Sequence, residues 1–256
     1  MARNLKAYAD KAHARGAYLI VDATFGPPPL QDPFLWGADL ILHSGTKFIG
    51  GHSDMLCGVL VVSPARSKEG WFDKLEAERA HLGNVMGSLE GWLGIRSLRT
   101  LEIRVQRQSY NAGKLVSWLN DALHPELESA SIDTPSLSSR NGKTIRSVLE
   151  SVQHASLQGD DLKAGWLKKQ MPNGFSPVFS IFLKTEGLAR KLPSKLSLFH
   201  HATSLGGVES LIEWRSMSDS TVDPRLVRLS IGIEAWEDLR DDLLQGFETL
   251  AKESNG

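Results

Sequence analysis

Cysteine is almost absent from this sequence: Cys57 is the single cysteine among 256 residues. A lone cysteine excludes an internal disulfide and is typical of a reducing compartment, so we expect a cytoplasmic protein. The residues that follow it, 58–62, are mostly apolar and predict a buried strand. This context makes Cys57 a core residue rather than a nucleophile.

Long apolar runs and an excess of one charge are also lacking. No apolar stretch approaches the roughly 18 residues of a membrane span, and the first residues are charged and helical, unlike a signal peptide. The 29 basic residues nearly balance the 30 acidic ones, which gives a formal net charge of −1. This balance offers no electrostatic case for nucleic acid or an anionic membrane, so we expect neither as a partner.

Nucleotide-binding and metal-binding patterns are missing too. The chain has neither a P-loop nor the glycine pattern of a dinucleotide-binding turn. His43 and His52, and the adjacent His200 and His201, have no cysteine or carboxylate partner at a zinc-site spacing. Adjacent side chains of a strand point to opposite faces, so the second pair would not chelate. We therefore predict no metal site.

The remaining composition indicates a globular α/β protein, because 41% of the residues are hydrophobic and 23% are charged. We predict two domains, 1–110 and 111–256, with a polar surface loop near 125–142. The predicted helices cover residues 2–15, 66–80, 88–110, 111–123, 188–198 and 236–250, and the predicted strands cover residues 17–21, 38–42, 57–62, 178–183 and 226–230.

Polar residues follow the first two predicted strands. Asp22 comes directly after one apolar run, and the segment His43-Ser44-Gly45-Thr46-Lys47 follows the next. Continuous apolar runs fit a parallel sheet covered on both faces, and such sheets bind ligands beyond the carboxyl ends of their strands. An acid, two hydroxyls and a lysine are the groups needed to hold pyridoxal 5′-phosphate (PLP). Two simpler explanations stay open, namely that Asp22 only caps a helix or turn and that Lys47 is a solvated loop residue.

Several sequence motifs resemble those of a known protein family. They are VDATF at 21–25, LQDPFLWGADLILHSGTKFIGGHSD at 30–54, GIRSLRTLEIR at 94–104, SLGGVESL at 204–211 and LVRLSIGIEAWEDLRDDL at 226–243. In this order they resemble the Cys/Met-metabolism family of PLP enzymes, which includes cystathionine γ-synthase, cystathionine lyases and methionine γ-lyase. The resemblance implies the C-terminal part of an aspartate-aminotransferase-like (type I) fold. We therefore expect a mainly parallel sheet with flanking helices, plus a smaller α/β C-terminal domain.

The resemblance also implies a role for each of six residues. Lys47 corresponds to the catalytic lysine that forms the Schiff base, Asp22 to the partner of the pyridine nitrogen, Ser44 and Thr46 to phosphate ligands, and Ser204 and Arg228 to substrate-binding residues. From the residues alone, Ser204 beside two glycines also fits plain turn chemistry. Arg228, among alternating apolar and polar residues, also fits the solvent face of an edge strand.

The activity implied by the resemblance is β- or γ-elimination or replacement on sulfur-containing or O-acylated amino acids. The implied partners are a small amino-acid substrate and further copies of the chain, in a dimer or tetramer. Family members carry a long segment before the lysine, with a glycine-rich phosphate cup and a stacking tyrosine, and we see no substitute for it. Because no substitute for the phosphate cup is visible, a catalytically impaired fragment or partner subunit is the alternative, and an aminotransferase ranks below both. Thr203 stands where cystathionine-processing members often have glutamate, which counts against cystathionine as the specific substrate.

Overall fold

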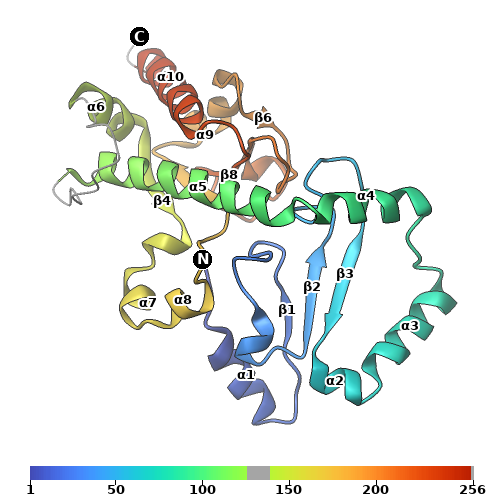
Figure 1. Cartoon of the computed structure of the whole chain (residues 1–256). Helices are drawn as coiled ribbons and strands as arrows, with labels where there is room; N and C mark the ends of the chain where they lie inside the picture. Colours follow the sequence, from blue (N-terminus) through green and yellow to red (C-terminus); the bar gives the residue numbers. More distant parts are fainter. Residues whose placement is uncertain (126–138, 255–256) are drawn as a thin grey trace. The chain divides into compact units, whose positions relative to one another are not determined.

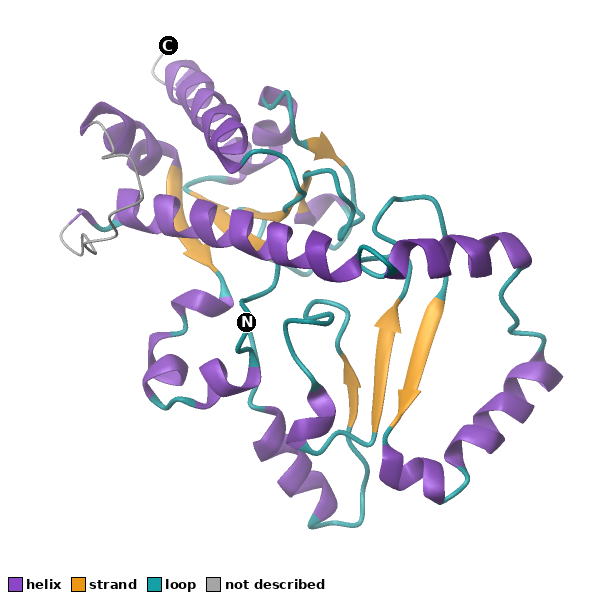
Figure 2. Ribbon diagram, viewed as in Figure 1, coloured by secondary structure: helices purple, strands orange, loops and turns teal. Residues whose placement is uncertain are grey.

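The computed structural model describes residues 1–125 and 139–254, drawn in Figures 1 and 2. The chain divides into two compact units. Unit 1 consists of Met1–Gln106 together with Gln158–Phe175, and unit 2 consists of Arg107–Leu157 together with Ser176–Gly256. Among the described residues, no helix is long and apolar enough to cross a bilayer.

Unit 1 contains a three-stranded sheet in the order β1-β2-β3 (Figure 2). The strands are β1 (Ile20–Asp22), β2 (Leu40–Ser44) and β3 (Gly58–Val62). The expected parallel pairing is found between β1 and β2, whereas β3 runs antiparallel to β2. The prediction that β3 is buried is wrong, because Leu60 and Val61 are largely exposed on this edge strand.

The sequence supplies caps and breaks for some of the helix ends in unit 1. Asn4 caps α1 by accepting a hydrogen bond from the N–H of Ala7, and Gly16, with φ of 66°, follows the helix. The single helix predicted over 66–80 is two helices, because Gly70 with φ of 80° separates them. The helices are α1 (Leu5–His13), η1 (Pro33–Trp36), α2 (Pro64–Lys68), α3 (Trp71–Leu82), α4 (Ser88–Leu98), α7 (Gly159–Lys163) and α8 (Trp166–Gln170).

Helix α5 (Leu101–Leu123) is continuous, and its residues are shared between the two units. The predicted break between residues 110 and 111 is therefore wrong, and the break lies instead between α4 and α5. There the N–H and the hydroxyl of Thr100 both donate to the carbonyl of Ser97 and close α4. Asn111 stays inside the helix because its buried amide donates to the carbonyls of Gly232 and Glu234.

Unit 2 contains a five-stranded sheet in the order β4-β5-β8-β7-β6. Its strands are β4 (Leu149–Gln153), β5 (Val178–Leu183), β6 (His200–His201), β7 (Leu211–Trp214) and β8 (Leu226–Ser230). Every pairing is antiparallel except that between β6 and β7. The predicted strands 178–183 and 226–230 are β5 and β8, and β8 lies in the middle of the sheet.

Apolar residues of this sheet and of α10 form the core of unit 2. Phe179 and Ile181 on β5 belong to one buried cluster with Leu243 and Phe247 on α10. Each such side chain stabilises the fold by about 1.5–3 kcal/mol when fully buried. The helices of this unit beyond α5 are α6 (Ser139–Val148), η3 (Ala155–Leu157), α9 (Glu186–Lys191), η4 (Leu192–Lys195), η5 (Arg215–Met217) and α10 (Trp236–Ser254).

Two predictions for this unit need correction. Most of the polar loop expected near 125–142 lies outside the described residues, but residues 139–142 belong to α6 and are helical. The helix predicted over 188–198 ends as an α-helix at Lys191, and Pro193 then lies in the short 3-10 helix η4. Proline lacks an N–H to continue the α-helical hydrogen bonds, which explains the early end.

Candidate functional site

Asp22 and Ser44 are the last residues of two parallel strands, so they lie at the same edge of the sheet. Thr24 connects them. Its N–H donates to Oδ1 of Asp22 at 3.0 Å, and its Oγ1 accepts from the N–H of Ser44 at 2.8 Å. Thr24 was not among the site residues predicted from the sequence, although it stands two residues after Asp22 in the VDATF segment.

Lys47 lies in a compact turn directly after β2. Its N–H donates to the carbonyl of Ser44 at 3.1 Å, and its carbonyl accepts from the N–H of Gly51 at 2.7 Å. The N–H of Gly50 donates back to the carbonyl of Gly45, also at 2.7 Å. The backbone on both sides of the half-buried lysine is therefore fixed by hydrogen bonds within the turn.

Thr46 joins this turn to the start of β3. Its hydroxyl accepts from the N–H of Cys57 at 3.1 Å and donates to the carbonyl of the same residue at 3.4 Å. Burial raises the pKa of the Cys57 thiol, which disfavours the nucleophilic thiolate. We call Asp22, Ser44, Thr46 and Lys47 the lysine cluster, and all four residues belong to unit 1.

His43 is a buried neighbour of the lysine cluster. Within the described residues, its Nδ1 atom is buried without a hydrogen-bond partner. Burial lowers the pKa of His43, while the negative charge of Asp22 opposes that shift. A buried imidazole nitrogen without a partner lies near the edge where β1 and β2 end.

Arg104, near the start of α5, contacts the turn of Lys47. Its guanidinium donates to the carbonyl of Phe48 at 2.9 Å and to that of Ile49 at 3.3 Å. Burial lowers the pKa of Arg104, but an arginine stays protonated in a protein. The charged guanidinium of Arg104 thus contacts the backbone of Phe48 and Ile49, the two residues that follow Lys47.

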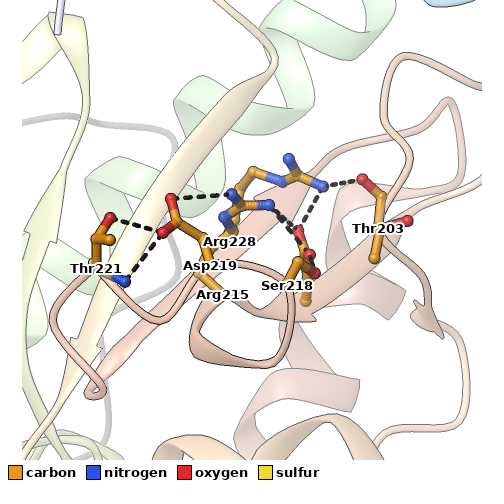
Figure 3. A network of polar contacts seen from close by, with 7 residues as sticks. Thr203, Arg215, Ser218, Asp219, Thr221 and Arg228 are labelled. Carbon is orange, nitrogen blue, oxygen red and sulfur yellow. Dashed lines mark hydrogen bonds and ion pairs between the residues drawn. The ribbon is translucent and has the colours of Figure 1, made fainter.

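Arg228 lies on the central strand β8 of unit 2, with a side chain only 14% exposed. It therefore does not occupy the solvent face of an edge strand, the simpler explanation left open above. Its Nη2 atom donates to the carbonyl of Thr203 at 2.5 Å (Figure 3). The same atom donates to the carbonyl of Ser204 at 2.9 Å. The structure thus brings Arg228 and Ser204 together through the backbone of the loop that begins SLGG.

Glu213 on β7 is the cross-strand partner of Arg228. Its carboxylate is completely buried, and Oε2 lies 2.7 Å from Nη2 of Arg228. Arg215 also contacts this carboxylate, at 2.9 and 3.1 Å, and the Ser218 hydroxyl donates to it. Figure 3 shows Arg215 and Arg228 close together in this network. We call Ser204, Glu213, Arg215 and Arg228 the arginine cluster; it belongs to unit 2.

Electrostatics explains why both arginines adjoin one acid. Burial lowers the pKa of Arg228, the charge of Glu213 counteracts this, and Arg215 adds to the lowering. A buried carboxylate needs charged and hydrogen-bonded partners, and Arg215 with Ser218 supplies those that Arg228 does not. Neither Glu213 nor Arg215 was singled out from the sequence, since their relation to Arg228 comes from strand pairing.

Within the described part of the chain, no group of three or more histidine, cysteine, aspartate or glutamate side chains is arranged to hold a metal ion.

The model of one protein family matches residues 2–248, and that family is described as "Cys/Met metabolism PLP-dependent enzyme". The chain belongs to this family. Its relatives include the cystathionine γ-synthase of Mycobacterium tuberculosis, which is 36% identical over 95% of this chain and 58% of the relative. The cystathionine γ-lyase of Bacillus subtilis is 33% identical over 96% of this chain and 60% of the relative.

Solved structures agree with this assignment. The methionine γ-lyase CalE6 of Micromonospora echinospora matches with a TM-score of 0.77 at 32% identity, over 97% of this chain and 62% of that one. The metB protein of Corynebacterium glutamicum matches with a TM-score of 0.79 at 30% identity, over 98% and 60%. The expected α/β fold, the C-terminal part of a type I PLP fold, is confirmed. The chain spans about 60% of the length of these relatives.

PLP is the cofactor of this family. The lysine cluster and its neighbour His43 offer polar groups that fit this cofactor. One oxygen of Asp22 accepts from Thr24, while the exposed carboxylate makes no other hydrogen bond within the described residues. Within the same residues, the buried Nδ1 of His43 is without a hydrogen-bond partner. Acceptors and donors without protein partners at the carboxyl edge of parallel strands are suited to a polar aromatic ligand.

Proposed function

We propose that this chain carries catalytic groups of a PLP-dependent transsulfuration-type enzyme. Its substrates would be amino acids with a sulfur or O-acyl leaving group, transformed by β- or γ-elimination or replacement. The observation that best supports the proposal is the placement of Asp22, Ser44 and Lys47 at the shared carboxyl edge of β1 and β2. When bound, PLP supplies an electron sink for charge that develops at the substrate α-carbon.

Each residue of the lysine cluster would contribute one function. The Nζ atom of Lys47 would bind the cofactor covalently, then take up and return the proton at the substrate α-carbon. The Asp22 carboxylate, oriented by Thr24, would keep the ring nitrogen protonated because a nearby negative charge favours the cation. Ser44 would donate its hydroxyl to the phosphate, and Thr46 would exchange its long contact with Cys57 for a phosphate oxygen.

The arginine cluster would bind the substrate α-carboxylate. Arg228 uses its Nη2 atom for Glu213 and the two loop carbonyls. Within the described residues, the Nε and Nη1 hydrogens are then left for a ligand. Charge-assisted hydrogen bonds from a guanidinium to a carboxylate are short and strong. Ser204, whose carbonyl contacts Arg228, would line the same site.

Assembly and location form part of the proposal. We expect a homo-oligomer, a dimer or tetramer, in the cytoplasm, because unit 1 exposes many large apolar side chains and the chain has one cysteine. A second candidate function is that of a catalytically impaired partner subunit. The chain spans about 60% of the length of the Bacillus subtilis relative, so an activity measurement has to distinguish the two functions.

Covalent trapping tests the proposed function directly. The purified chain is mixed with PLP, reduced with borohydride and digested, and the modified lysine is located by mass spectrometry. We expect a visible absorbance band and modification of Lys47, both lost in Lys47→Ala and retained in the control Lys68→Ala, which changes an exposed lysine. Modification of another lysine would overturn the assignment. Release of an α-keto acid from cystathionine then separates a catalyst from a partner subunit.

A further inference from the structure

Arg104 is a buried arginine whose hydrogen bonds, among the residues that the structure describes, reach only uncharged groups. It is 5% exposed. Its acceptors are the carbonyls of Phe48, Ile49 and Ser97, at 2.9, 3.3 and 3.0 Å, and the hydroxyl of Thr100 at 3.1 Å. Burying a charge is costly unless it is well hydrogen-bonded, so a guanidinium buried among carbonyls requires all of these contacts. The requirement ties Arg104 to the position of each acceptor.

The acceptors join two separate segments of unit 1. Phe48 and Ile49 directly follow Lys47, whereas Ser97 and Thr100 end α4 and precede α5. The planar fork of a guanidinium can serve several carbonyls at once, which the single ammonium of lysine cannot reproduce. Arg104 therefore connects the turn that carries Lys47 to the hydrogen-bonded junction between α4 and α5.

Gly51 leaves the space that the guanidinium occupies. Its φ of +67° is a conformation that side chains other than glycine rarely adopt. A Cβ atom at this position would lie 1.9 Å from Nη1 of Arg104 and 3.1 Å from the carbonyl oxygen of Phe48. The same glycine donates its N–H to the carbonyl of Lys47. Gly51 therefore both leaves room for the Arg104 guanidinium and closes the turn by its hydrogen bond to Lys47.

We propose that Arg104 is a positioning residue that holds the turn of Lys47 in the geometry needed for its chemistry. Its catalytic consequence rests on the function proposed for Lys47, while its effect on the turn does not. A flexible lysine side chain is placed only as well as its backbone, and reacting groups need placement within about 0.5 Å. Without Arg104, the carbonyls of Phe48 and Ile49 would lose their charged donor, and the turn would open more often.

Hydrogen exchange measures this effect without any cofactor. Amide exchange is followed by mass spectrometry in the full chain for the wild type, Arg104→Ala, Arg104→Lys and the matched control Arg99→Ala, which removes an exposed arginine from the same junction. We expect exchange in the segment 45–55 to be about tenfold faster in both Arg104 variants, at the amides of Gly50 and Gly51 above all. The β2 and β5 segments and the control should exchange at wild-type rates.

Chemical rescue separates positioning from general support of the fold. Guanidinium ion, added at low concentrations that do not denature the protein, should slow exchange in 45–55 of Arg104→Ala and leave Arg104→Lys unchanged. Covalent trapping of PLP on Lys47 should be about tenfold slower in Arg104→Ala and recover with the same ion. Should Arg104→Ala not fold, Arg104→Lys, which keeps the charge but lacks the planar fork of donors, should give the same local pattern.

Two results would overturn the inference. One is unchanged exchange in 45–55 of the Arg104 variants, and the other is an equal increase over all of unit 1, which would indicate a general structural role. Failure of the proposed function looks different. In that case PLP is not trapped on Lys47 even in the wild type, while the local exchange difference at 45–55 persists.

Discussion

Glu213 and Arg228 are directly opposite residues on two adjacent antiparallel strands, and their charged atoms Oε2 and Nη2 are 2.7 Å apart. The Glu213 side chain has no exposed surface, so the ion pair cannot exchange its partners for water. Directly opposite positions bring side chains of opposite charge into contact on one face of a sheet. The pair therefore fixes the orientation of the arginine to which we assign substrate binding.

Removing the acid should destabilise unit 2. Glu213→Ala leaves Arg228 and Arg215 without their shared buried carboxylate, and breaking a buried pair typically costs about 3–5 kcal/mol. We expect a loss of this size in the free energy of unfolding, measured by urea denaturation. The matched control is Glu150→Gln, which breaks the exposed ion pair with Arg225 and should cost less than about 1 kcal/mol. Equal losses in the two variants would contradict the importance of the buried pair.

The carboxylate of Asp22 should matter for turnover more than for cofactor retention. In Asp22→Asn the amide cannot stabilise a protonated ring nitrogen, so charge developing at the α-carbon is poorly accommodated. We expect trapped PLP to remain measurable while turnover falls by about two orders of magnitude or more, the range typical of lost proton-transfer chemistry. The comparison is made in a preparation in which the wild type is active, with Asp54→Asn as the exposed control. Wild-type turnover in Asp22→Asn would refute this role.

The 256-residue chain tested by itself should bind PLP weakly. The donors expected for the phosphate in this chain are Ser44 and Thr46, and each missing charge-assisted hydrogen bond weakens binding by about 1.5–3 kcal/mol. Losing two such contacts corresponds to about a thousandfold in Kd, at roughly 1.4 kcal/mol per factor of ten. A fluorescence titration measures the affinity. Adding the N-terminal 40% of a relative should tighten binding, whereas tight stoichiometric binding by the chain alone would contradict the prediction.

The stability of unit 2 should fall as the solution is acidified below the usual histidine range. Burial lowers the pKa of His154 from its usual 6.5, while its contact with the Ser176 carbonyl opposes the shift. Between the two pKa values, His154 binds a proton in the unfolded chain but not in the folded chain. The free energy of unfolding therefore keeps its full value above about pH 6.5 and decreases below it. The limiting slope is about 1.4 kcal/mol per pH unit for one histidine.

Urea unfolding of the wild type and His154→Gln at pH 7.5 and 5.5 measures this dependence. We expect a smaller loss on acidification in the variant, because glutamine can still donate to the Ser176 carbonyl and does not titrate. An exposed histidine, changed in His81→Gln, is the control and should retain the wild-type dependence. Identical pH dependence in wild type and His154→Gln would exclude His154 as the cause.

Unit 1 should promote self-association. Large apolar side chains are exposed on β3, on α3 and α4, and in the loop between α3 and α4. Monomeric proteins rarely leave extensive apolar surface uncovered. The exposed side chains include Leu60, Val61, Phe72, Leu82, Val85, Met86, Leu89, Trp92 and Ile95. Light scattering at micromolar concentration should report a dimer or larger species. Leu89→Glu combined with Trp92→Glu should lower the measured mass, and a stable wild-type monomer would contradict the prediction.

Local sequence was sufficient for much of the secondary structure. The apolar runs before Asp22 and Ser44 predicted β1 and β2, and the alternation around Arg228 predicted β8, because a strand's pattern reflects the surfaces it buries. The helix break expected after Tyr110 was wrong for the opposite reason. The polar Asn111 is buried by contacts with residues more than 100 positions later, which no local pattern reveals.

The sequence by itself determined the family and its candidate residues, because Lys47, Asp22 and Arg228 stand within distinctive sequence motifs. Tertiary structure alone decided which groups surround them. Strand register sets Glu213 opposite Arg228, and the approach of α5 sets Arg104 against the carbonyls of Phe48 and Ile49. It also decided that residues 158–175 belong to unit 1 and that β3 is an exposed edge. Burial and hydrogen-bond partnership depend on segments far apart in the chain, so they emerge only when the chain has folded.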